Sequence, residues 1–218
     1  MGTITRNFAN NLTTSGLLKP TAFNNDSFDN VTSVPSGSVE VGAMQFISSA
    51  TASSSASIEF SLGAYKEYQF YWVNCHPQNN QVDFQINFST DNGSNYNVVK
   101  TTSVFDAFHY ENDTGNALQY IGSRDLAQST GNAMIDFVSN DNDHSSSGIL
   151  KLFNPSSNTY VKHFISVGND AWLDVPHPVT QNVYVSGYAN TVSPLTNIRF
   201  TMSSGNIDAG EIILFGVS

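Results

Sequence analysis

Apolar and polar residues alternate most regularly along residues 81–89. A period of two places successive side chains on opposite faces of a β-strand, so this segment is predicted to bury one face and expose the other. The residues expected inside are Val82, Phe84, Ile86 and Phe88, and those expected outside are Asp83, Gln85 and Asn87. The following residues, 90–95, contain Gly93, which readily adopts a positive φ, and they predict a hairpin to a return strand at 96–105.

Short segments of similar character recur along the rest of the chain and bring the expected total to about ten strands. They lie at 39–47, 57–62, 67–75, 131–138, 148–153, 159–166, 182–188, 196–202 and 211–217. Gly, Asn, Ser and Pro separate them, and no helical period intervenes. This pattern predicts an all-β protein, an antiparallel β-sandwich of jelly-roll-like form. Residues 107–128 are less regular and are expected to form an excursion loop.

The first 37 residues differ from the rest of the chain. Their apolar residues occur singly, without a sustained period, and are too few to form a core. We therefore predict two parts, an extended N-terminal anchoring arm at 1–37 and a β-sandwich domain at 38–218. The residues expected to fill pockets on a partner are Phe8, Leu12, Leu17, Leu18, Phe23 and Phe28. An arm folded back onto its own domain is the alternative.

Composition narrows the range of partners. The 218 residues carry 8 basic and 18 acidic side chains, a formal net charge of −10, and no Lys or Arg cluster. Binding to nucleic acid normally needs a basic patch, so no nucleic-acid partner is expected. No apolar run approaches a membrane span and no signal-peptide pattern is present, so we expect no membrane insertion and a soluble, uncleaved product. The single cysteine, Cys75, is expected to be a buried core thiol.

The chain contains none of the common catalytic motifs, and its five histidines are scattered. The carboxylates that could form a glycosidase pair, Glu59, Glu67, Asp83 and Asp136, stand where the alternation places solvent-facing residues. The Asp/Asn-rich runs at 91–93 and 141–143 lack the full spacing of a calcium loop. We therefore expect that the protein is not an enzyme and binds no cofactor and no metal. A glycan-active enzyme is the remaining alternative.

Three aromatic residues are candidate ligand-binding platforms, since exposed rings can stack on sugars. They are Trp172, Trp72 and Tyr120. Trp72 shares a strand pattern with Phe70 and Val73, which favours a place in the core. Trp172 is expected in a loop at 171–173, as either a binding residue or a subunit contact.

The opening of the chain and the turns of its body resemble a known family. The segments that carry this likeness are residues 1–16 and 32–35, the segment 89–94, the Asn154-Pro155 turn, the Gly187-Tyr188 pair, and the closing segments 197–200, 205–207 and 210–216. The opening looks like the leader of virion structural proteins of marine tailed phages, cyanophages especially. The body is similar to the β-sandwich domains of phage tail-fibre and head-decoration proteins.

This resemblance implies a non-enzymatic protein of the virion surface, made in the bacterial host cytoplasm and anchored by its N-terminal arm. Head decoration and a tail-fibre or adhesin role both fit it. The implied partners are other capsid or tail proteins and a host-surface glycan, and a homotrimer is expected. The family contributes no catalytic residues. A carbohydrate-binding β-sandwich module is the alternative function.

Overall fold

The alternating segments form twelve β-strands in the computed structural model, which describes residues 44–174 and 177–217, without the side chains of residues 173 and 174. These residues belong to the unit Val41–Ser218. The strands make two antiparallel sheets that pack as a sandwich, which confirms the predicted fold class. The anchoring arm predicted at 1–37, with its six apolar residues, lies outside the described residues.

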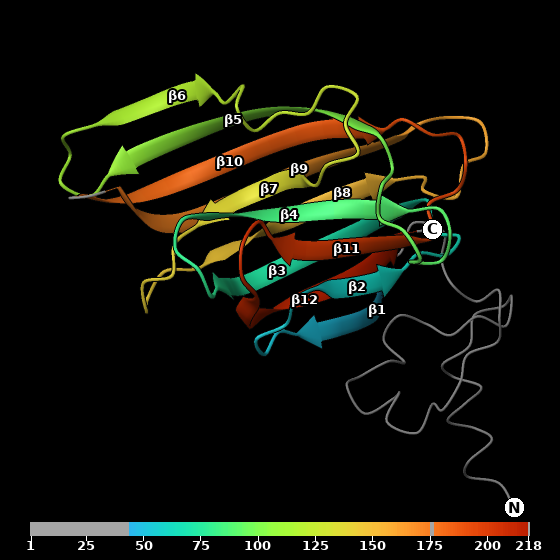
Figure 1. The fold of residues 1–218 in the computed structure, drawn as a ribbon, viewed down its shortest axis with the longest axis horizontal. Coiled ribbons are helices and arrows are strands. Elements are labelled where there is room, and N and C mark those ends of the chain that lie inside the picture. Colours follow the sequence, from blue (N-terminus) through green and yellow to red (C-terminus); the bar gives the residue numbers. More distant parts are fainter. Residues whose placement is uncertain (1–43, 175–176, 218) are drawn as a thin grey trace, which may run out of the picture. The chain divides into compact units, whose positions relative to one another are not determined.

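The two sheets differ in width (Figure 1). The larger has eight strands, in the order β1 (Met44–Thr51), β12 (Ile207–Val217), β3 (Glu67–Pro77), β8 (Ser146–Phe153), β9 (Lys162–Asp174), β10 (His177–Ala189), β5 (Lys100–Tyr110) and β6 (Asn116–Tyr120). The smaller has four strands, in the order β2 (Ile58–Ser61), β11 (Asn197–Met202), β4 (Val82–Ser89) and β7 (Ala133–Val138).

The core lies between the sheets and is centred on aromatic side chains. Phe200 of β11 packs against Phe70 of β3 at a ring-centroid distance of 5.4 Å and against Phe84 of β4 at 5.9 Å. All three rings are fully buried. Their alternation with half-buried or exposed neighbours explains why these segments are strands, because each buries one face against the opposite sheet.

The pattern predicted for β4 is confirmed on its inner face, where Val82, Phe84, Ile86 and Phe88 are all buried. Asp83 and Gln85 lie half-buried on the other face. The prediction is wrong for Asn87, which is 2% exposed. Its Oδ1 accepts a hydrogen bond of 2.6 Å from the buried Lys100 ammonium, and its Nδ2 donates to the carbonyl of Thr130 at 3.1 Å. The outer face of β4 is thus partly covered by segments distant in sequence.

The hairpin predicted after β4 is not formed. The turn itself is present, with Gly93 at φ 81° and the Asn95 amide donating to Asp91 at 2.9 Å, but the chain then crosses to the other sheet. β4 pairs with β11 and β7, whereas β5 pairs with β10 and β6. β5 and β10 form a ladder of eleven residue pairs, more than the eight residues of β4 could provide.

The excursion loop predicted at 107–128 is also only partly correct. Ala107–Tyr110 completes β5, and β6 then pairs antiparallel with it. Sequence alternation was a weak signal here, because β6 is an edge strand of five residues and none of them is buried. The irregular part of this segment begins after Tyr120.

The greater width of the eight-stranded sheet leaves part of its inner face beyond the smaller sheet. β7, the edge of the smaller sheet, packs on β9 and β10, and Figure 1 shows β5 and β6 extending past it. The segment 121–132 runs along β5 instead, with Thr102 donating to the Leu126 carbonyl at 2.9 Å and Lys100 to the Ser129 carbonyl at 2.8 Å. A cavity forms where β5, β10, β7 and this segment meet.

Candidate functional site

The outer face of the eight-stranded sheet carries a continuous row of apolar side chains. One residue per strand pairs in register with the next across the whole sheet. From the β12 side, the row consists of Ile213, Tyr71, Ile149, Val167, Tyr184, Phe105 and Tyr120, and Ser49 of β1 stands at its end. We call these seven apolar residues the apolar row.

The apolar row contains no charged side chain, and it is exposed at Phe105 and Tyr120 and half-buried along its other five residues. Phe105 and Tyr120 are 41% and 60% exposed, and Phe105 stacks on Tyr184 at a centroid distance of 4.9 Å and an angle of 7°. The charged groups beside it include Asp125, which accepts a hydrogen bond from the Tyr120 hydroxyl, and the pair Glu67 and Lys151, which lie 3.8 Å apart. Soluble monomers rarely leave such extended apolar surfaces in water, so this face has the character of an interface.

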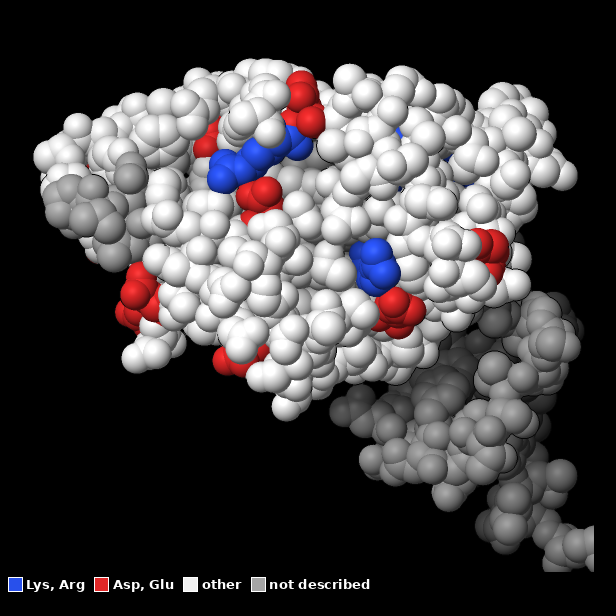
Figure 2. Space-filling view, viewed as in Figure 1, with Lys and Arg blue, Asp and Glu red and all other residues white. Residues whose placement is uncertain are grey.

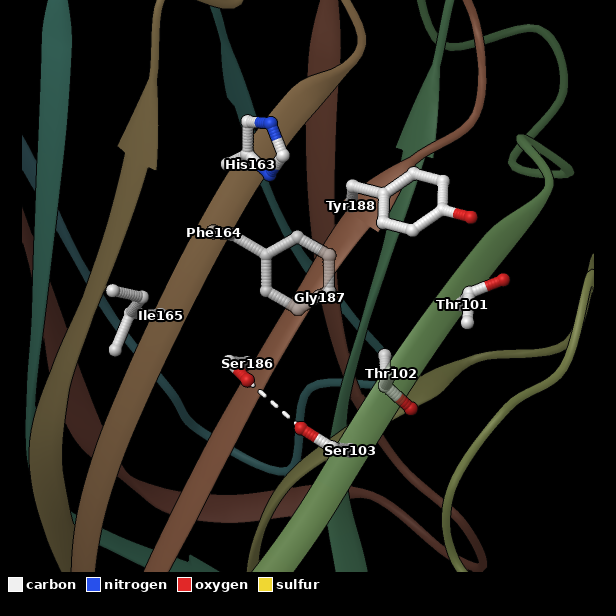
Figure 3. Close-up of a pocket in the computed structure, with 9 residues that line it drawn as sticks. All are labelled: Thr101, Thr102, Ser103, His163, Phe164, Ile165, Ser186, Gly187 and Tyr188. Carbon is white, nitrogen blue, oxygen red and sulfur yellow. Dashed lines mark hydrogen bonds between the residues drawn. The ribbon is translucent and has the colours of Figure 1, made fainter.

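A shallow hollow of about 490 Å³ adjoins the apolar row, around Gly187 (Figure 3). The rings of His163 and Tyr188 stand on one side of it, 6.2 Å apart, and the Ser103 and Ser186 hydroxyls hydrogen-bond at 2.8 Å on the other. None of the four is buried. The hollow is therefore a shallow surface depression on the outer face of the sheet.

A second cavity, of about 260 Å³, lies on the inner side of the large sheet, and we call it the inner pocket. Its walls come from β5, β6, β7, β9, β10 and the segment after β6. The lining residues are Asp106, Phe108, Tyr110, Gln119, Ile121, Arg124, Phe137, Trp172 and Gln181. Rings form much of the wall, with Phe137 edge-on to Trp172 at 5.2 Å and Phe108 beside Tyr110 at 5.5 Å.

Several buried polar atoms of the inner pocket have no hydrogen-bond partner. Gln181 Nε2 donates to one carboxylate oxygen of Asp106, but Asp106 Oδ1 and Gln181 Oε1 remain unpaired. Trp172 Nε1 is an unpaired donor. Asp106 and Gln181 are 1% and 4% exposed. Leaving buried polar groups unpaired costs about 1–3 kcal/mol each.

The single guanidinium of the inner pocket is already neutralised. Arg124 Nε lies 2.9 Å from Asp83 Oδ1, and its guanidinium carbon lies 4.4 Å above the centre of the Phe137 ring. Burial raises the pKa of Asp83, and the Arg124 charge opposes this. The cavity therefore has aromatic walls and no net cationic group.

A chain of buried polar groups leads from the inner pocket into the core. Asp170 of β9 faces Gln181 and Ser146 across the neighbouring strands, and Ser146 donates to Asp136 of β7. Burial raises the pKa of Asp170, and the Asp136 charge raises it further; burial also raises the pKa of Asp136. A protonated Asp170 can donate to the Asp136 carboxylate, which lets two acidic groups share a site that excludes water.

The prediction that the four carboxylates face solvent is therefore wrong for Asp136, which is fully buried. All six residues of β7 are buried, because its outer side is covered as well as its inner side. The sequence signal for the burial of Asp136 was its position as a polar residue within an otherwise apolar run. Asp106 and Gln181, which sequence reasoning missed, carried a similar signal, since each occupies an inward position among buried residues such as Val104 and Val183.

The structure separates the three predicted aromatic platforms. Trp172 lines the inner pocket, on β9 and not in the expected loop. Trp72 is 1% exposed in the core, where its Nε1 donates to Ser146 at 2.7 Å, so it offers no surface for stacking. Tyr120 belongs to the apolar row on the outer face, and its hydroxyl donates to Asp125 at 2.5 Å. Trp172 and Tyr120 therefore cannot serve one site.

Cys75 is fully buried, as predicted, and burial raises the pKa of its thiol to about 12. No group of three His, Cys, Asp or Glu side chains is placed to hold a metal ion among residues 44–174 and 177–217. Within the same residues, no helix has the length and apolarity that a membrane crossing requires.

Basic groups do not gather on the face seen in Figure 2, where each lies beside acidic groups. Two lysines are inside the protein. Lys100 is fully buried, and burial lowers the pKa of its ammonium to about 8; Lys162 donates to the Thr191 carbonyl at 3.0 Å.

Comparisons of the chain with protein-family models, with curated proteins and with solved structures gave no match.

Proposed function

We propose that the protein is a non-enzymatic structural protein of a phage virion surface, which displays its β-sandwich and packs against other copies of itself through the apolar row. The observation that carries the proposal is this uncharged apolar row across seven of the eight strands of the large sheet. The virion setting is supported by the resemblance of residues 1–16 and 32–35 to phage structural proteins. The arm at 1–37 would anchor the sandwich to capsid or tail proteins.

Charge and area favour another copy of the chain as the occupant of this face. The protein has a net charge of −10, so identical copies repel each other except where a surface is free of charge. Eight strands about 4.8 Å apart, with about six residues of each at about 3.3 Å per residue, give an outer face on the order of 700 Å², which includes the apolar row. Standard interfaces bury about 800 Å² on each partner, so the face is large enough for a stable contact. In the expected homotrimer, three such faces would surround the three-fold axis.

The proposal is tested by placing a charge in the apolar row and measuring the mass of the protein in solution by light scattering. The unmodified protein should form an oligomer, a trimer being three times the 23.7 kDa chain mass. Phe105→Asp should dissociate it, because burying an unpaired carboxylate at the contact is costly. Tyr160→Asp is the matched control, since Tyr160 is 70% exposed in the segment between β8 and β9.

Salt provides an independent readout of the same contact. An apolar contact between acidic chains should strengthen as salt screens their repulsion, whereas a contact built on ion pairs should weaken. A monomeric unmodified protein, or an oligomer that Phe105→Asp leaves intact, would contradict the proposal. Circular dichroism of each variant shows whether the sandwich is still folded.

A further inference from the structure

We propose that the side chains of Lys100 and Asn87 join in a spontaneous isopeptide bond, which ties β5 of the larger sheet to β4 of the smaller one. Lys100 Nζ lies 2.6 Å from Asn87 Oδ1, and the two residues are 0% and 2% exposed. The bond is a modification that the folded chain makes in itself. It is independent of the self-assembly proposed above, because both residues are enclosed within one copy of the protein.

The buried ammonium of Lys100 is the first reason to expect this reaction. A charged group inside a protein is costly unless an opposite charge compensates it. Within the described part of the chain, no carboxylate forms an ion pair with Lys100. Its ammonium donates instead to two neutral oxygens, Asn87 Oδ1 and the Val98 carbonyl, each at 2.6 Å. Formation of an amide would replace the buried charge with a neutral group and remove this cost.

Burial also makes Lys100 a better nucleophile. It lowers the pKa of the ammonium from 10.5 to about 8, so a larger share of the amine is unprotonated than in an exposed lysine. The Val98 carbonyl holds Nζ beside the amide of Asn87. Because a C=O bond is about 1.2 Å long, Nζ lies no more than about 3.8 Å from Asn87 Cγ. Reacting atoms meet at about 3–3.5 Å, so a small movement of the amine suffices.

The amide of Asn87 is held in a way that favours attack on its carbon. The Phe88 backbone N–H donates to Oδ1 at 2.9 Å, where negative charge develops during the attack. On the other side of the amide, Nδ2 donates to the Thr130 carbonyl at 3.1 Å and to Asn132 Oδ1 at 2.9 Å. These contacts fix the plane of the amide, so its carbon is presented to Lys100 in one orientation.

The reaction needs no co-reactant. The lone pair of the unprotonated Lys100 amine attacks Asn87 Cγ, and a bond forms between Nζ and Cγ. One proton passes from Nζ to Nδ2, the bond between Cγ and Nδ2 breaks, and ammonia leaves. The product is a secondary amide between the two side chains, and the protein becomes lighter by one ammonia, about 17 Da.

Intact mass spectrometry of the full-length protein tests the proposal. The mass is expected to be about 17 Da below that of the sequence, after allowance for removal of Met1. Fragmentation of a protease digest should reveal one branched peptide that contains both Asn87 and Lys100. A folded protein with the full mass of its sequence, or a digest in which these two residues occur only in unlinked peptides, would overturn the proposal.

Two variants remove the reacting groups one at a time. Lys100→Met keeps an unbranched side chain without the amine, and Asn87→Ala removes the amide, so both should have the full mass of their sequences. Lys162→Met is the matched control. Lys162 is also fully buried, but its Nζ donates to the backbone carbonyl of Thr191 at 3.0 Å, and the loss of ammonia should persist in this variant.

Ring closure at the Asn92-Gly93 turn would release the same mass, and two measurements separate it from the isopeptide bond. The resulting succinimide hydrolyses in mild base and would survive in Lys100→Met, whereas the isopeptide bond persists in mild base and requires Lys100. A loss of ammonia that Lys100→Met retains would therefore refute the proposal. The branched peptide is sought in the unmodified protein, so this result does not depend on the folding of any variant.

Discussion

Individual buried acids decide the local chemistry of this sandwich. Asp106, Asp136 and Asp170 are each no more than 2% exposed, although ionised carboxylates are strongly disfavoured away from water. Two of them accept hydrogen bonds from neighbouring side chains, with Ser146 donating to Asp136 and Gln181 to Asp106. No fixed donor reaches either oxygen of Asp170, which fits a protonated group.

Replacing Asp170 with asparagine should stabilise the protein at pH 7. Burial and the Asp136 charge raise the pKa of Asp170, so the folded protein holds a proton that the unfolded chain releases. The stability contributed by this proton is complete below the ordinary Asp pKa of about 4 and is lost as pH rises, by about 1.4 kcal/mol per pH unit. The amide of Asp170→Asn needs no proton and should recover up to about 4 kcal/mol at pH 7, from three pH units at about 1.4 kcal/mol each.

Urea unfolding at several pH values measures this effect. The unmodified protein should lose stability between pH 4 and pH 7 more steeply than Asp170→Asn does. Asp208→Asn, at an exposed site, is expected to follow the unmodified curve. A loss of stability in Asp170→Asn at pH 7 would mean that the ionised carboxylate is the native form.

At the scale of elements, β4 shows how well alternation determines a strand. Its inward residues contact Phe200 of the smaller sheet and Trp72 of the larger sheet, and the ring centroids of Phe84 and Trp72 lie 5.8 Å apart. Its outward residues make mainly polar contacts, such as that of Gln85 Oε1 with Asn132 at 3.2 Å. The two faces should therefore respond very differently to truncation.

Phe84→Ala should lower the free energy of unfolding by about 3–5 kcal/mol, because it removes buried apolar surface and leaves a cavity. Gln85→Ala should cost less than about 1 kcal/mol, since the side chain is half-buried and makes one long hydrogen bond. Chemical denaturation of both variants tests the register of β4. Equal losses for the two substitutions would show that its assignment is incorrect.

At the scale of the whole molecule, the apolar row and the inner pocket lie on separate surfaces. The apolar row lies on the outer face of the large sheet, and the inner pocket opens on its inner side, where β5 and β6 extend past β7. An oligomer formed through the apolar row would leave the inner pocket accessible. Anchoring would then depend on residues 1–37, which are separate from both surfaces in sequence.

Deletion of residues 1–37 should abolish incorporation of the protein into particles and leave the sandwich folded. The buried core residues between Ala52 and Leu214 form one cluster that packs against itself, so its β-type circular dichroism should be retained. Quantitative mass spectrometry of purified particles measures the copy number. Loading of the truncated protein at the normal copy number would show that the arm is not the anchor.

The sequence by itself determined the fold class and most strand positions. Alternation is a local property, and burial of one face per strand follows directly from it, as Val82, Phe84, Ile86 and Phe88 illustrate. The burial of Cys75 was also predictable, because a lone cysteine is usually interior.

Only the tertiary structure decided which strands pair and which polar residues are enclosed. β5 follows β4 in the chain but joins the other sheet, because its eleven-residue ladder with β10 depends on a segment some eighty residues away. Asn87 and Asp136 look like surface residues in sequence and are buried by distant segments. The inner pocket arises in the same way, since Asp106, Gln181 and Trp172 lie on three strands whose adjacency is set by long-range pairing that local periodicity does not encode.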